Sequence, residues 1–142
     1  MERERAGYKP VNETLYNSRK NYVERHGGIV MRGGDEVTRH LDRQGAGGSC
    51  NNDVILLRDD ATTSEVLEET YHFEQNRSGE YEKYPDDEVN LRIEIDAQKW
   101  LLSVSKRYNI PRDEIEQTKK NLAVYERKLD EVLRSRDDSK RM

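Results

Sequence analysis

Three side chains on one predicted helix are of types that bind metals or move protons. Glu68 and His72 are four residues apart, and Glu69 directly follows Glu68. On a helix of 3.6 residues per turn, residues four apart lie one above the other, so Glu68 and His72 can contact one ion. Carboxylates and imidazoles both bind divalent metals, and a further carboxylate beside them can act as a general base. The spacing indicates a metal centre, although a histidine bonded to a neighbouring acid would give the same pattern.

The helix that carries these residues is predicted over residues 62–77. It opens with Thr62-x-x-Glu65, a capping box in which each residue satisfies a backbone N–H of the other. The helical arrangement puts an apolar set on one face (Val66, Leu67, Thr70 and Phe73) and a polar set on the other (Glu65, Glu68, Glu69, His72 and Gln75). We therefore expect one face in the core and the metal-binding face opposite it.

A third ligand is expected from the next helix, predicted over residues 86–108. Glu94 lies between two apolar stripes of that helix and should point inward, whereas Asp96 lies on its charged stripe. A buried salt bridge or hydrogen bond would also explain an inward Glu94. In the metal-site interpretation, Glu68, His72 and Glu94 hold the ion, and Glu69 accepts a proton from the attacking water. Two carboxylates beside one imidazole weaken the preference for zinc, so manganese, iron or calcium are also candidates for the ion.

The remaining chain predicts a mostly helical α+β domain with a small sheet of two or three strands. A single domain is expected over residues 1–134, followed by a disordered tail at 135–142. Gly45 to Ser49 is expected to be a flexible turn. The other expected elements are helices at 11–25, 35–43 and 111–133, and strands at 29–31 and 54–57. The helix at 111–133 carries a heptad seam that packs on its own domain or on another copy.

Charge and composition narrow the classes of partner. The net charge is −4, and residues 53–100 alone carry fourteen acidic and five basic side chains, a balance of −9. An acidic region repels phosphate backbones and attracts cations, which argues against nucleic acid. No apolar run has the length of a membrane span, and no signal-peptide pattern opens the chain. We expect no membrane partner. We expect either a cytoplasmic protein or one exported by a signal-independent route. The only cysteine is Cys50, which excludes an internal disulfide.

Two motifs resemble those of minimal zincin metallopeptidases. They are Val66-Leu67-Glu68-Glu69-x-x-His72-x-x-Gln75, which follows the strand at 54–57, and the later Glu94-Ile95-x-Ala97-Gln98. The similar domains occur at the C-terminal ends of bacterial polymorphic toxins and in phage-associated proteins. Their active helix carries His-Glu-x-x-His, and their third ligand is a Glu in a Glu-x-x-Ala context. The resemblance covers about residues 20–130, and Glu68 stands where the family has its first histidine.

This resemblance implies a zinc-dependent hydrolase of peptides or proteins, in a setting such as a toxin-like effector. Two other functions fit the same sequence. One is a zincin-derived binding module that holds no metal and acts by contact. The other is a structural or assembly protein that forms homo-oligomers through its C-terminal helix. Metal content separates the hydrolase from both, and the mass in solution identifies the oligomer.

Overall fold

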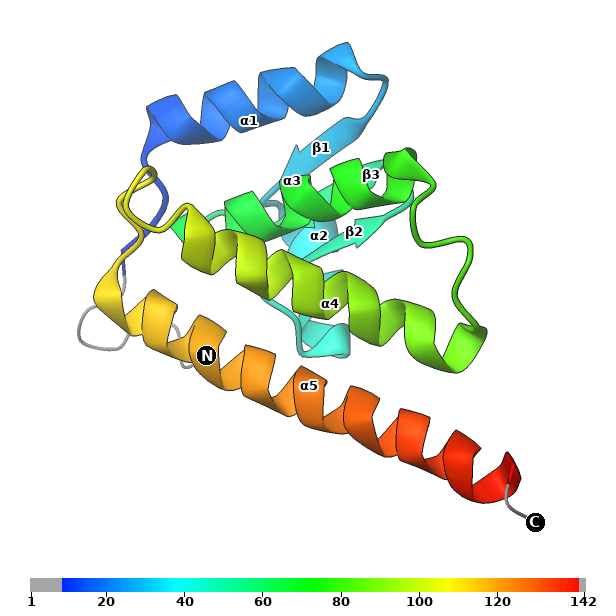
Figure 1. Ribbon diagram of the computed structural model, residues 1–142. Helices are drawn as coiled ribbons and strands as arrows, with labels where there is room; N and C mark the ends of the chain where they lie inside the picture. Colours follow the sequence, from blue (N-terminus) through cyan, green and yellow to red (C-terminus); the bar gives the residue numbers. More distant parts are fainter. Residues whose placement is uncertain (1–8, 141–142) are drawn as a thin grey trace. The chain divides into compact units, whose positions relative to one another are not determined.

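The computed structural model describes residues 9–140 and has the mostly helical α+β fold expected from the sequence. Its helices and strands are α1 (Glu13–Arg25), β1 (Ile29–Arg32), α2 (Asp35–Gln44), β2 (Gly48–Asn51), β3 (Val54–Leu57), α3 (Thr63–Ser78), α4 (Asp86–Ser103) and α5 (Arg112–Lys140). Contacts divide the chain into two compact units, Met1–Arg77 and Ser78–Met142. The first unit contains the sheet and the second contains α4 and α5 (Figure 1).

The sheet of the first unit has three strands in the order β1-β3-β2. β1 runs parallel to β3, with Val30 opposite Ile55, and β2 runs antiparallel to β3, with Cys50 opposite Ile55. β1 and β3 lie where the apolar runs predicted strands. β2 was not predicted: Gly48 and Ser49 were expected to belong to the flexible turn, and no strand was expected over Cys50 and Asn51. Pairing with β3 orders this segment despite its weak β-forming composition.

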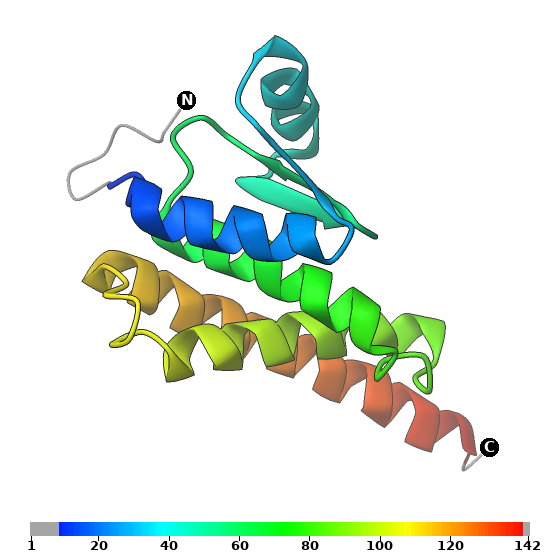
Figure 2. The same cartoon turned by 90° about the horizontal axis from the view of Figure 1, so that it is seen from above.

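The core of the first unit lies between one face of the sheet and the helices α1 and α3. Ile55 and Leu57 of β3 are fully buried on that face. They belong to a cluster that also contains Val11, Tyr16 and Val23 of the N-terminal part, Ala61 just before α3, and Val66 and Phe73 of α3. Seen from above, α1 and α3 run side by side and α2 lies on the opposite side of the sheet (Figure 2). The apolar face predicted for α3 is therefore confirmed as a core face.

The opposite face of the sheet is only partly covered. Ile29 and Met31 on β1 keep 53% and 47% of their surface exposed, and they are the large apolar side chains classed as exposed in the described part of the chain. α2 buries Val37 and Leu41. Its end is tied to the unit by Arg58, which bonds the Asp42 carboxylate at 2.7 Å and the backbone oxygen of Ala46.

The second unit is a hairpin of α4 and α5, which run antiparallel along each other (Figure 1). α4 ends at Ser103, before the expected bound of 108, because residues 104–109 form turns that lead into Pro111. α5 continues to Lys140, so residues 135–140 of the expected disordered tail are helical; residues 141 and 142 lie outside the described residues. Among the described residues, no helix is long and apolar enough to cross a membrane.

Candidate metal centre

The capping box expected from the sequence forms at the start of α3, which follows β3 after a short connection. The Glu65 backbone N–H donates to Thr62 Oγ1 at 3.2 Å, and the Thr62 N–H donates to Glu65 Oε1 at 2.9 Å. These two bonds satisfy donors that the first turn of a helix otherwise leaves unpaired. They fix where the helix begins, and thereby which residues of the next two turns share a face.

Glu68 and His72 lie together on that face. Glu68 Oε1 is 3.9 Å from His72 Nε2, too long for a hydrogen bond. Two ligands of a tetrahedral zinc ion are roughly 3.4 Å apart, given metal–ligand bonds of about 2.0–2.1 Å. The observed spacing is slightly longer, so a small side-chain movement would let both atoms contact one ion. A direct ion pair of these groups is the competing interpretation, and it requires a protonated imidazole.

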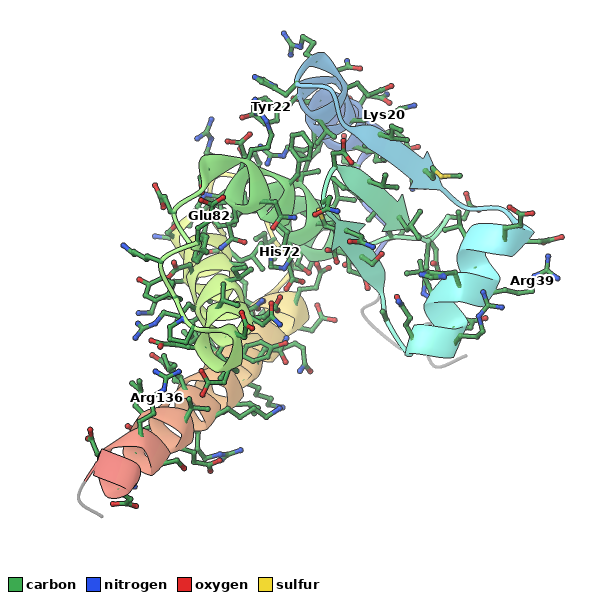
Figure 3. The ribbon with its side chains drawn as sticks, turned by 90° about the vertical axis from the view of Figure 1, so that its right-hand side faces the viewer. Lys20, Tyr22, Arg39, His72, Glu82 and Arg136 are labelled. Carbon is green, nitrogen blue, oxygen red and sulfur yellow. The ribbon has the colours of Figure 1, made fainter. Side chains whose placement is uncertain are left out.

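The other ring nitrogen of His72 is engaged inside the protein. His72 Nδ1 lies 2.7 Å from Oε1 of Gln75, and both side chains are buried. Figure 3 shows His72 on α3, away from Tyr22 of α1, whose hydroxyl donates to Glu74 on the other side of the helix. Sequence reasoning placed Gln75 on the polar face but gave it no role. Its position three residues after His72 could have predicted this contact, because residues three apart are neighbours on a helix.

Glu69 is buried, with 8% of its surface exposed. The start of β2 lies against it: a Cβ added to Gly48 would be 3.1 Å from both Cγ and Oε2 of Glu69. A Cβ added to the preceding Gly47 would overlap Oε2 of Glu65. The two glycines therefore let a backbone segment approach the acidic side of α3 more closely than any other residue would. This explains the glycine-rich stretch as a packing requirement of Glu65 and Glu69.

The expected third ligand belongs to the second unit. Glu94 is half-buried on α4, whereas Asp96, two residues on, is exposed and accepts a hydrogen bond from the Tyr81 hydroxyl at 2.6 Å. Asp96 is exposed, as expected for a side chain on the charged stripe, and Glu94 is more buried than Asp96. The expected donor set combines a carboxylate oxygen and an imidazole nitrogen, from Glu68 and His72 of the first unit, with a carboxylate oxygen from Glu94 of the second unit. That chemistry fits a divalent cation such as zinc.

Cys50 does not join this donor set. It lies on the core face of β2, and burial raises the pKa of its thiol to about 12, with the charge of Glu69 acting in the same direction. Asn76 donates to its sulfur at 3.7 Å. A nucleophilic cysteine needs a thiolate near neutral pH, and the raised pKa of Cys50 opposes this.

Comparisons of the chain with protein-family models, with curated proteins and with solved structures found no match. A functional assignment therefore depends on the site and on the sequence motifs.

Proposed function

We propose that this protein is a metal-dependent hydrolase of peptides or proteins, of zincin type. The observation that carries the proposal is the arrangement of His72: Gln75 occupies Nδ1, and Nε2 faces the Glu68 carboxylate across 3.9 Å. Metal-binding histidines in proteins usually donate one ring N–H to an acceptor and bind the ion through the other nitrogen. Glu94, which matches the Glu-x-x-Ala context, is the third ligand in this proposal.

Each residue has a distinct part in the proposed reaction. Glu68, His72 and Glu94 hold the ion. A bound divalent cation supplies Lewis acidity toward water and the substrate carbonyl. Glu69 accepts the proton that the attacking water loses and passes it to the leaving amine nitrogen. Glu69 is buried beside Gly48, which restricts the positions that its carboxylate can take.

Calorimetric titration with zinc tests this proposal. We expect one ion per chain in the parent and a loss of affinity of at least about tenfold in His72→Ala and in Glu94→Gln, since each removes one of three ligands. His40→Ala, on α2, and Asp96→Asn, on α4, are the matched controls and should bind as the parent does. Hydrolysis of an unstructured protein such as casein should then require zinc and disappear in Glu69→Gln. Equal zinc binding by all five proteins, or by none, would refute the metal site.

A further inference from the structure

The bond between His72 and Gln75 determines which imidazole nitrogen carries the proton. The contact joins Nδ1 to the amide oxygen Oε1 at 2.7 Å. An amide oxygen can only accept a hydrogen bond, so Nδ1 must be the donor. A neutral imidazole has one N–H and one lone pair, and the lone pair is then on Nε2. Nε2 is the nitrogen that faces Glu68.

We infer that Gln75 is a positioning residue that holds His72 in the Nδ1–H tautomer and thereby makes Nε2 its metal-binding atom. This inference rests on the proposed function. The three residues follow one another along the polar face of α3, in the order Glu68, His72 and Gln75. Gln75 is therefore placed behind the imidazole, on the side away from Glu68.

Burial makes this bond a constraint on the imidazole. His72 and Gln75 keep 9% and 5% of their surface exposed, so water competes little for either group. The cost of leaving a buried polar group unpaired opposes rotation of the ring, which would exchange the two nitrogens. One histidine nitrogen is thus held toward Glu68 before any ion binds.

The choice of glutamine over a carboxylate also has a physical reason. The polar face of α3 already carries Glu65, Glu68 and Glu69 within two turns. A neutral amide accepts the imidazole proton without adding a further negative charge to that group. A carboxylate oxygen can also accept this hydrogen bond. Gln75→Glu is therefore a variant that keeps the acceptor and changes only the charge.

Nitrogen NMR on the metal-free protein tests the inference without any activity measurement. Long-range proton–nitrogen spectra, recorded at about pH 8 where a histidine of ordinary pKa is neutral, distinguish the two tautomers. His72→Ala identifies the His72 signals. We expect the Nδ1–H form in the parent and in Gln75→Glu, and a shift toward Nε2–H in Gln75→Leu, which has no acceptor. Gln117→Leu, an exposed glutamine on α5, should match the parent.

Zinc titration of the same variants completes the test. Gln75→Leu should lose roughly 10–100-fold in affinity, the range found when an outer hydrogen bond to a metal ligand is removed. An Nε2–H tautomer in the parent, or an unchanged tautomer in Gln75→Leu, would overturn the inference; if the leucine variant does not fold, the parent spectrum decides. If the tautomer shifts as expected but the parent binds no zinc, the positioning of His72 by Gln75 is supported and the proposed hydrolase function is refuted.

Discussion

Arg136, near the end of α5, donates through Nη1 to Oε2 of Glu88, in the first turn of α4, at 2.6 Å. The two residues are 48 positions apart in the sequence. Arg92 donates to the other carboxylate oxygen of Glu88 at 2.8 Å, so both oxygens of this buried side chain are paired. Arg136 also bonds Asp87. The last turns of α5 are therefore attached to the start of α4, in a segment whose composition alone indicates disorder.

We expect Arg136→Gln to lower the melting temperature, because it removes a charged partner from a buried carboxylate. Arg134→Gln is the matched control: Arg134 is exposed and pairs with Asp130 one turn away, an interaction worth little. Thermal unfolding followed by circular dichroism measures both. Equal melting temperatures for the two variants would show that the end of α5 does not contribute to stability.

Glu88 gives the second unit a pH dependence with a defined sign. Hydrogen bonds from Arg136 and Arg92 lower the pKa of Glu88 below that of an ordinary glutamate. A carboxylate with a lowered folded-state pKa stabilises the fold above its unfolded pKa of about 4.3, and this contribution is lost as the pH falls through the folded value. The parent should therefore melt higher than Glu88→Gln at pH near 7, and the difference should shrink below about pH 4. A difference that stays constant across this range would contradict the pairing.

The strongest local patterns predicted most of the fold. The capping box at Thr62 and the apolar run at Val54–Leu57 correctly placed a strand followed by a helix, since both signals depend on residues close in sequence. β2 and the end of α5 could not be found in this way. Gly48–Asn51 has little intrinsic preference for a strand, and its order comes from pairing with β3. Residues 135–140 are polar, and their helix is held by partners near residue 88.

The candidate site likewise has features that the local sequence predicts and features that depend on distant contacts. Helical spacing correctly placed Glu68 and His72 together on the polar side of α3, because side chains four apart are neighbours on any helix. It did not reveal that this polar side is also buried. The approach of Gly48 to Glu69 depends on a strand that local composition did not predict. The bond between His72 and Gln75 depends on side-chain rotamers, which the spacing permits but does not select.

Phe73 should be the most costly side chain of the first unit to truncate. It is fully buried on α3, and an added Cβ at Gly28 would lie 2.5 Å from its ring, so it fills its site completely. Phe73→Ala is expected to reduce the free energy of unfolding by about 3–5 kcal/mol. Ile29→Ala, at the exposed apolar position on β1, should change it by no more than about 0.5 kcal/mol. Urea denaturation of both variants checks this, and similar costs at the two positions would contradict the assigned core.

Cys50 should react slowly with thiol reagents. Burial raises its pKa to about 12, so very little thiolate is present at pH 8, and the thiolate is the reactive form. We expect alkylation by iodoacetamide in the folded protein to be at least about 100-fold slower than in the urea-unfolded chain, where the pKa is about 8.5. Samples quenched at successive times and analysed by mass spectrometry give the alkylation rates of the folded and the unfolded protein. Fast modification of the folded protein would mean that Cys50 is accessible and ionised.

The substitution Glu68→His tests the feature that most separates this chain from the zincin motif. Position 68 already lies one turn before His72, with a carboxylate oxygen 3.9 Å from Nε2. An imidazole there would complete His-x-x-x-His on one face of α3, with Glu69 retained between the two ligands. Zinc prefers nitrogen to carboxylate ligands more strongly than manganese or calcium does, so the exchange should favour zinc in particular.

We expect Glu68→His to bind zinc more tightly than the parent by at least about tenfold, or 1.4 kcal/mol, with an unchanged circular dichroism spectrum. Glu116→His, the same exchange at an exposed position on α5, controls for an added histidine. Any gain in zinc-dependent peptide hydrolysis should disappear in the double variant Glu68→His with Glu69→Gln, because an amide cannot accept the proton of the attacking water. If Glu68→His binds zinc no better than Glu116→His does, then positions 68 and 72 do not share an ion, and the polar side of α3 is a hydrogen-bonded surface without a metal.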